Sequence, residues 1–589
     1  MFHRTNTPST DAHAESAWIQ KLDTPVRDAG SHASHSGPLF GLTFAIKDNI
    51  NAAGVPTTAA CPEFAHTPTE HATVVHRLLQ SGAKLKGKTN LDQFACGLNG
   101  TRSPYGAVPN AFNPEYVSGG SSSGSAYVVA TGQVDFALGT DTAGSGRVPA
   151  GLNNIVGFKP TKGRLSTTGV LPAARSVDTV SIFARSVPLA WEVLMVAAGH
   201  DQQDPYSRSE HDLPWRAQPF PRSPRIGVPD ALEFFGDAES RAAFDRSLQR
   251  LRDMGAQLVS IDYSPLSQAA DLLYGSALVA ERHSAIRDFF DSNEAAVIEP
   301  VRTIIKQAHQ YSATDVYDAQ LKLKALDQFV RPMWQKIDLM VVPTAPTHVR
   351  IQDMMDDPIE LNRRLGYYTN FVNLLDYAAL SVPSDFRKDG LPFGITFIGP
   401  AGSDWPLAEW GTRYHAQVNQ DSPKSWGATQ RPLTPFDLTP PHPPGPELSL
   451  QPECQLAVVG AHLSGMPLNG QLTERGARLI ERARTAACYK LFALADTKPA
   501  KPGLIRVDAT DGVSVDVEIW SLPLSKYGSF VAGIPAPLGI GTLELEDGRK
   551  VQGFLCEPHA LERATDISPY GGWRAYVESQ QTQVSHSPA

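Results

Sequence analysis

The stretch GTDTAGSGRVPA, residues 139–150, places a serine, Ser145, among glycines, threonines and one alanine. Glycines let backbone amides approach a bound group closely, and such amides can stabilise the oxyanion that forms when a serine attacks a carbonyl. A serine hydroxyl is a poor nucleophile until a base takes its proton. The chain has no histidine between His76 and His200, so a base from this part of the sequence is another residue type.

Two more segments supply candidates for the base and for a proton relay: FAIKDNI (44–50) and GGSSSGSA (119–126). Lys47 ends an apolar stretch that is expected to be buried, and burial lowers the pKa of a lysine so that a neutral amine can act as the base. Taken alone, each segment is more often a solvated loop or turn. Together they predict a serine nucleophile activated through a second serine by a lysine, a known substitute for the histidine triad. The candidate oxyanion hole consists of the amides of Thr142, Ala143, Gly144 and Ser145.

The pattern around these segments is typical of an α/β fold. Short buried strands are predicted at 43–47, 83–89 and 135–140, and a buried helix of small residues at 123–132. Strands that alternate with helices favour a parallel or mixed sheet covered by helices on both faces. Apolar residues at helical spacing predict further amphipathic helices at 238–257 and 315–334.

A proline-rich segment divides the chain, because residues 431–447 contain seven prolines in seventeen residues and such a run is an extended spacer. Beyond it, residues 513–520 alternate apolar and polar, and 543–554 predict a hairpin with Asp547-Gly548 in a type I′ turn. The chain is therefore divided into an N-terminal tail (1–38), an α/β domain (39–430), a linker (431–449), an α+β domain (450–577) and a C-terminal tail (578–589).

Composition excludes several classes of protein. The chain has 589 residues, of which 41% are apolar and 19% charged, and its net charge is −9. An acidic chain lacks the basic footprint of a nucleic-acid binder, and no apolar run is long enough to span a membrane. The N-terminus does not read as a signal peptide, and five scattered cysteines suggest neither a disulfide framework nor zinc pairs. We expect a cytoplasmic protein.

The three segments closely resemble the amidase signature family, which carries GGSSSGSA, then GTDTGGSIRxPA, with an upstream lysine in an IKDN-like strand. The likeness covers about residues 39–415 and includes the loop at 99–120. The resemblance implies that Ser145 is the nucleophile, Ser121 the bridging serine and Lys47 the base. It also implies a cis peptide before Ser121 and a mechanism that needs neither a metal nor an organic cofactor.

Departures from the general motif point to one branch of that family, the allophanate hydrolases. Ala143 replaces a glycine and Gly146 an isoleucine. YGSALVAER (274–282) resembles a stretch of that branch in which a tyrosine and an arginine hold the substrate, here Tyr274 and Arg282. From the sequence alone, a tyrosine at the edge of the core and an exposed Glu-Arg pair is the more common interpretation.

The C-terminal region is similar to the domain attached to allophanate hydrolases, which is related in fold to γ-glutamylcyclotransferases. The likeness rests on 457–472 and 570–576. We favour a structural role for this domain. An alternative is a second site that assists decarboxylation, for which His462 is the candidate, although some relatives carry a histidine where this chain has Gly470.

The resemblance implies hydrolysis of allophanate, a urea with a carboxylate on one nitrogen, as the last step of ATP-dependent urea degradation. It implies a small-molecule substrate, urea carboxylase as a partner, and a homodimer. Alternatives are a broad amidase, a glutamine-hydrolysing amidotransferase component that releases ammonia, and a binding protein on an inactive amidase scaffold. A P-loop nucleotide binder is excluded because G-x-x-x-x-G-K-[ST] does not occur in the glycine-rich segments.

Overall fold

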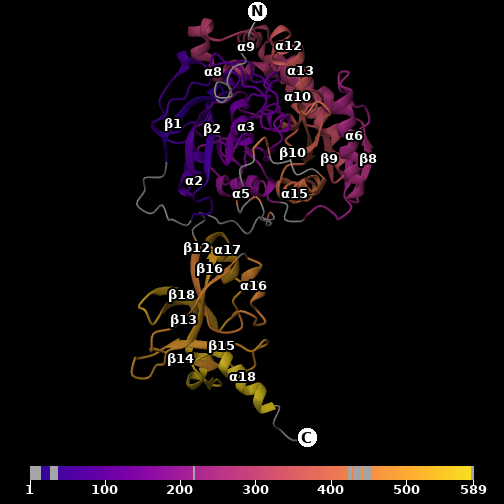
Figure 1. Cartoon of the computed structure of the whole chain (residues 1–589). Coiled ribbons are helices and arrows are strands. Elements are labelled where there is room, and N and C mark those ends of the chain that lie inside the picture. The colour runs from indigo at the N-terminus through magenta and orange to yellow at the C-terminus, as the bar shows by residue number, and fades with distance from the viewer. Residues whose placement is uncertain are drawn as a thin grey trace, which may run out of the picture. The chain divides into compact units, whose positions relative to one another are not determined.

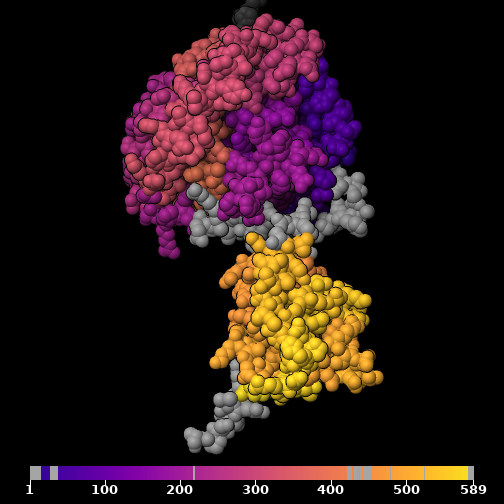
Figure 2. Space-filling view, turned by 180° about the vertical axis from the view of Figure 1, so that it is seen from behind, coloured from indigo at the N-terminus to yellow at the C-terminus, as the bar shows by residue number. Residues whose placement is uncertain are grey.

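The chain forms two compact units, Met1–Pro444 and Gly445–Ala589. The computed structural model describes residues 15–26, 37–215, 219–421, 427–429, 434, 437, 441, 453–475 and 477–584. Each unit has its own hydrophobic core and its own sheets, and the second runs from orange to yellow in Figure 1 and Figure 2. None of the described helices is long and apolar enough to cross a membrane.

A large mixed sheet forms the centre of unit 1, as the sequence predicted. Its inner strand β2 runs parallel to both neighbours, β3 and β4, whereas β4 and β6 are antiparallel. The described strands, in order across the sheet, are β1 (Trp18–Val26), β3 (Lys84–Thr89), β2 (Thr43–Lys47), β4 (Phe136–Asp141), β6 (Thr179–Ala184), β5 (Val156–Lys159), β10 (Ala378–Phe386), β11 (Pro392–Gly399), β9 (Leu339–Pro343), β7 (Arg225–Pro229) and β8 (Gln257–Ile261).

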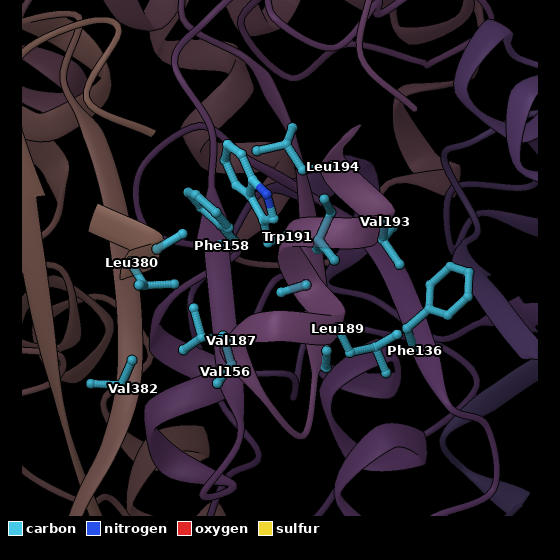
Figure 3. Close-up of a cluster of buried hydrophobic side chains, with 14 of the residues drawn as sticks. Phe136, Val156, Phe158, Val187, Leu189, Trp191, Val193, Leu194, Leu380 and Val382 are labelled. Carbon is cyan, nitrogen blue, oxygen red and sulfur yellow. The ribbon is translucent and has the colours of Figure 1, made fainter. Parts of the chain in front are cut away.

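Helices cover both faces of this sheet because successive side chains of a strand point to opposite faces. Phe136 and Leu138 of β4 pack with Trp191 in one cluster, part of which Figure 3 shows. Ala137, between them, packs in a different cluster with Ala126. The first cluster includes residues of α2 (Thr73–Gln80), α5 (Val187–Ala197), α6 (Ala238–Asp253) and α15 (Asp404–Asp421), and the second includes residues of α3 (Ser123–Ala130) and α4 (Val148–Leu152).

The chain between β8 and β10 is mostly helical, and many of its helices lie around the upper part of unit 1 in Figure 1. The described helices not yet named are η1 (Pro62–Phe64), η2 (Gln93–Ala95), α7 (Ser264–Gly275), η3 (Ala277–Val279), α8 (Ala280–Asn293), η4 (Glu294–Ala296), α9 (Val301–Lys306), η5 (Gln307–Gln310), α10 (Ala313–Val330), α11 (Met333–Lys336), α12 (Ile351–Asp356), α13 (Glu360–Leu365) and α14 (Asn370–Leu374). A capping box of Ser312 and Asp315 begins α10.

Unit 2 is an α+β domain, as predicted. Its larger sheet has the order β13 (Arg478–Arg484), β16 (Asp516–Pro523), β12 (Glu453–Val458), β18 (Lys550–Cys556) and β17 (Leu538–Glu544). Its smaller sheet has the order β15 (Pro502–Arg506), β14 (Tyr489–Ala493) and β19 (Thr565–Asp566). Its described helices are α16 (Gly470–Thr473), α17 (Leu524–Val531), η7 (Pro558–Leu561), η8 (Ser568–Tyr570) and α18 (Trp573–Val584).

The structure corrects three local predictions. Residues 1–38 are not a tail throughout, because β1 pairs with β3 at the sheet edge. Asp437, within the predicted linker, is buried and accepts a hydrogen bond from Ser186 of unit 1; most of 431–449 lies outside the described residues. The turn between β17 and β18 is not type I′, since Gly548 has a positive φ (84°) and Asp547 does not. Helix α18 also continues past residue 577.

All five cysteines are free thiols, which agrees with the expectation that the chain has no disulfide framework. Cys61, Cys96 and Cys556 are buried, and the other two are partly buried. Burial raises the pKa of the Cys61 thiol to about 11, so that this thiol stays protonated and unreactive near neutral pH.

Candidate active site

Lys47, Ser121 and Ser145 meet in a buried cluster at one edge of the central sheet. Since β2 and β4 are parallel neighbours, Lys47 at the end of β2 and the turn after β4 lie at the same edge. Lys47 Nζ is 2.7 Å from Ser121 Oγ, which is 3.0 Å from Ser145 Oγ. The three side chains thus form a continuous hydrogen-bonded chain that water barely reaches. The peptide bond between Gly120 and Ser121 is cis.

A buried ion pair shapes the turn that presents Ser145. The Asp141 carboxylate pairs with the guanidinium of Arg147 through two contacts of 2.9 Å, and neither side chain is exposed. The same carboxylate accepts the backbone N–H groups of Gly144 and Gly146. Burial alone would raise the pKa of Asp141, but the charge of Arg147 and these hydrogen bonds outweigh it and lower that pKa. The ionised pair therefore closes a tight loop around Ser145.

The glycines of this turn are required by close contacts. Gly144 has a φ of 130°, and an added Cβ would lie 2.3 Å from Thr369 Oγ1. An added Cβ at Gly146 would lie 2.4 Å from the Cβ of Ser181. A branched side chain at position 146 therefore does not fit against β6, which accounts for the departure from isoleucine at this position of the motif.

Lys47 has the environment that a neutral amine base needs. Burial lowers the pKa of Lys47 to about 7, although the carboxylates of Asp92, Asp178 and Asp141 act in the opposite direction. The amine also lies 2.8 Å from Thr140 Oγ1. When neutral, it can donate an N–H to Thr140 and keep its lone pair for the proton of Ser121.

The four amides proposed for the oxyanion hole are not equivalent. The N–H of Gly144 donates to Asp141 at 2.9 Å, so it is not available to an oxyanion, and the prediction is wrong for this residue. Among the described residues, the amides of Thr142, Ala143 and Ser145 have no hydrogen-bond acceptor. Those three remain candidates for oxyanion stabilisation.

Tyr274 and Arg282 contact each other, but not on one continuous helix as expected. Helix α7 ends at Gly275, and Ser276 caps the short helix that leads into α8. Arg282 Nη2 nevertheless donates to the Tyr274 hydroxyl at 2.9 Å, and the guanidinium lies 4.9 Å from the ring centre. Arg282 is 4% exposed, so the expectation of an exposed Glu-Arg pair is wrong for this residue.

The remaining guanidinium nitrogen of Arg282, Nη1, is buried and has no hydrogen-bond partner in the described part of the chain. A buried, unpaired charged donor is costly and calls for an anionic partner. The charge of Arg282 lowers the pKa values of both Lys47 and Asp178, which places it near the serine–lysine cluster.

Sequence reasoning missed Asp178 and Thr140. Asp178 accepts hydrogen bonds from the Thr142 hydroxyl and from the backbone N–H groups of Ala173 and Ala174. Burial raises the pKa of Asp178 to about 6 despite these bonds, and the residue borders a cavity of about 140 Å³. Nothing in the local pattern of VDTV marks Asp178. Thr140, by contrast, adjoins the GTDT motif and its hydroxyl points toward the lysine.

His462 lies apart in unit 2, in a cavity of about 240 Å³ that Lys498 and Lys501 also line. Its ring stacks on Phe554 at 5.1 Å and contacts Phe530 at 5.3 Å. Its Nε2 lies 3.0 Å from Gln471 Oε1, and burial lowers its pKa. The histidine therefore packs as a core-edge residue and borders an internal space at the same time.

Comparison with known proteins agrees with this architecture. The family model described as amidase matches residues 6–407. The chain belongs to the amidase family. The model for the allophanate hydrolase C-terminal domain matches residues 454–578 of the same chain. This amidase thus carries the additional domain that the sequence pattern indicated.

Individual relatives support the same grouping. The amidase is 41% identical to an allophanate hydrolase of Kluyveromyces lactis, with a TM-score of 0.70 over 98% of this chain and 94% of the other. It is 43% identical to urea amidolyase of Saccharomyces cerevisiae over 93% of this chain, but spans only 30% of that protein's length. The amidase-type component of the glutamyl-tRNA(Gln) amidotransferase from Thermotoga maritima is 26% identical, with a TM-score of 0.60 over 72% of this chain and 91% of the other.

The lowered pKa of Lys47 predicts the pH dependence of activity. Only the neutral amine can accept the proton of Ser121, so kcat/KM is expected to rise with pH and level off above a pKa of about 7. One unit below that pKa, kcat/KM should fall about tenfold. Initial rates of ammonia release, corrected for the enzyme-free reaction, measure this profile. A flat profile between pH 6 and 8 would show that Lys47 does not act as a titrating base.

Proposed function

We propose that this amidase hydrolyses allophanate, the carboxylated urea, and releases ammonia. The proposal is carried by Arg282, a buried guanidinium with an unpaired nitrogen near a serine–serine–lysine cluster. The carboxylate is the only full charge on allophanate, and a guanidinium grips such a group with two parallel hydrogen bonds. The likeness to an allophanate hydrolase over nearly the whole chain supports the same substrate.

In the proposed first step, neutral Lys47 takes a proton from Ser121 as Ser121 takes one from Ser145. The contacts of 2.7 and 3.0 Å allow this direction of transfer because a hydroxyl can both donate and accept. The Ser145 oxygen attacks the terminal carbamoyl carbon, and the free amides of the turn stabilise the oxyanion. Ser121 then donates a proton to the leaving nitrogen, and ammonia departs.

In the second step, water attacks the acyl-enzyme through the same proton relay. The carbon–oxygen bond to Ser145 breaks, and the product is N-carboxycarbamate, which loses carbon dioxide. Tyr274 accepts a hydrogen bond from Arg282, so its own hydroxyl proton is left to donate to the substrate. The residues proposed for this cycle act by proton transfer, hydrogen bonding and charge.

For unit 2 we propose chiefly a structural role, with assistance to decarboxylation at His462 as the alternative. A chain that ends at Pro444 is expected to lose solubility or change its oligomeric state. His462→Ala should leave ammonia release unchanged but destabilise unit 2 by about 1–2 kcal/mol, because the ring packing is lost. A slower release of carbon dioxide by the variant would support the alternative.

Two results would contradict these roles of unit 2. A truncated chain that is soluble, fully active and unchanged in oligomeric state would rule out the structural role. Carbon dioxide release that is unaltered by His462→Ala, followed separately from ammonia, would rule out assistance at this residue.

We further propose that an ATP-dependent urea carboxylase supplies the substrate, that the protein works in the cytoplasm and that it forms a homodimer. The first point is supported by the likeness to urea amidolyases, of which the chain spans about a third. The dimer is an expectation that light scattering of the purified protein tests directly.

A substrate panel tests the proposed activity. Purified protein is assayed for ammonia release from allophanate, from simple amides and from glutamine. The proposal expects kcat/KM to be highest for allophanate by at least two orders of magnitude. A preference for glutamine would favour the amidotransferase alternative, comparable rates on all amides would favour a broad amidase, and no turnover of any would favour a binding protein.

A further inference from the structure

Two histidines and one aspartate form a cluster that takes no part in the proposed reaction. His283 and Asp291 belong to α8, and His309 belongs to η5. One potential ligand atom from each lies within 4.8 Å of the other two. Among the described residues, this is the one group of three with that property. We propose that it binds a divalent transition metal ion, and that Zn²⁺ fits it best.

The ligand types select the class of metal. Imidazole nitrogens with a carboxylate oxygen are a zinc donor set, whereas Mg²⁺ and Ca²⁺ prefer oxygen ligands throughout. Around a tetrahedral zinc ion with bonds of about 2.0–2.2 Å, neighbouring ligand atoms are roughly 3.3 Å apart. His283 Nε2 and Asp291 Oδ1 are now 2.8 Å apart, as a hydrogen bond. Small side-chain rotations therefore suffice, with the metal replacing the shared proton and water filling the fourth position.

Access and position also suit an ion. The side chain of Asp291 is 49% exposed and that of His283 is 13% exposed, so an ion can enter from solvent while one ligand remains held by packing. The rings of His283 and His309 have centroids 4.7 Å apart. The ring of Phe290 contacts His283 edge-on at 5.6 Å and restricts how far it can turn.

A break in α8 builds this cluster. His283 and Asp291 are eight residues apart, and eight residues of a continuous helix rise about 12 Å, which is too far for their side chains to hydrogen-bond. Ile286 leaves the helical conformation, with φ −133° and ψ 23°, and the change of direction brings the two side chains together. A metal ion would tie the two halves of α8 to each other and to η5.

The consequence is a stabilised segment beside the proposed carboxylate-binding residue. His283 directly follows Arg282 in α8, so an ion at His283 holds the helical turn that carries Arg282. An ion that binds only the folded protein raises its stability in proportion to the logarithm of its concentration above Kd. The melting temperature of the full chain should therefore rise on addition of Zn²⁺.

Metal binding by the full chain, with purification tags removed and metals stripped by a chelator, tests the proposal. Zn²⁺ is titrated in competition with a chromogenic chelator, and Co²⁺ serves as a spectroscopic substitute. We expect one tight equivalent in the wild type, the intense visible bands of four-coordinate Co²⁺, and a rise in Tm. His309→Ala should weaken Zn²⁺ binding at least tenfold and remove the Tm rise, and Asp291→Asn should weaken it in the same direction.

His211→Ala is the matched control. His211 is an exposed histidine beside a carboxylate, Asp212, at 3.5 Å, but it belongs to no such three-ligand group in the described part of the chain. Its loss should leave the tight equivalent in place. Equal Zn²⁺ affinity in the wild type and His309→Ala, an unchanged Tm shift in that variant, or a weak six-coordinate Co²⁺ spectrum would each overturn the proposal.

Discussion

Lys47→Ala is expected to lower kcat for allophanate by about 10⁴-fold or more, and Ser145→Ala by a similar factor. The reason is the continuous chain of contacts from Lys47 through Ser121 to Ser145, in which removal of one member disables the others. The double variant should therefore be only slightly slower than the slower single variant. Stopped-time assays of ammonia release measure all three.

Ser125→Ala is a matched control for this prediction. Ser125 is also a buried serine of α3, but its hydroxyl donates to the carbonyl of Leu138, away from Ser145. This variant should retain most of the activity. Near wild-type turnover by Lys47→Ala at neutral pH would sink the prediction, as would inactivation by a histidine-directed reagent in a protein that does not need Lys47.

Arg282→Ala is expected to lower kcat/KM for allophanate by about 10²–10³-fold. The variant leaves the substrate carboxylate without its partner in a buried site, a loss of several kcal/mol when a desolvated charge pair is broken. Arg282→Lys should recover only part of the activity because an ammonium cannot form two parallel hydrogen bonds. The loss should be much smaller for biuret, a neutral analogue.

Arg287→Ala provides the control on the same helix, since Arg287 is an exposed residue of α8. It should behave as the wild type with both substrates. Equal losses on allophanate and biuret for Arg282→Ala would mean that Arg282 supports the fold through its contact with Tyr274 and does not select the carboxylate. Thermal unfolding of each variant separates lost folding from lost recognition.

Much of the architecture could be predicted because its signals are local. The strands β2, β3 and β4 are short runs with strong burial, and their predicted and observed ranges agree within one residue. The edge strand β1 was missed because it alternates weakly and is mostly exposed, so that its sequence lacks a hydrophobic period. Its pairing with β3 depends on a partner far along the chain.

The turn between β17 and β18 shows how a correct signal can give a wrong detail. Asp547-Gly548 predicted a hairpin, and the two strands are antiparallel as expected. The N–H of Gly548 bonds to the carbonyl of Leu545, so the loop is longer than a two-residue turn and only its glycine needs a positive φ. Strand register, which the dipeptide does not encode, decides the loop length.

The sequence by itself determined which residues carry the chemistry of this amidase, because Lys47, Ser121 and Ser145 stand in short motifs of small and apolar residues. Only the tertiary structure decided how they are tuned. The parallel pairing of β2 and β4 buries the amine of Lys47 and lowers its pKa to about 7, and Asp178 reaches the site from a different segment. Burial and electrostatic fields depend on groups that are distant in sequence and adjacent in space, and no local pattern records those distances.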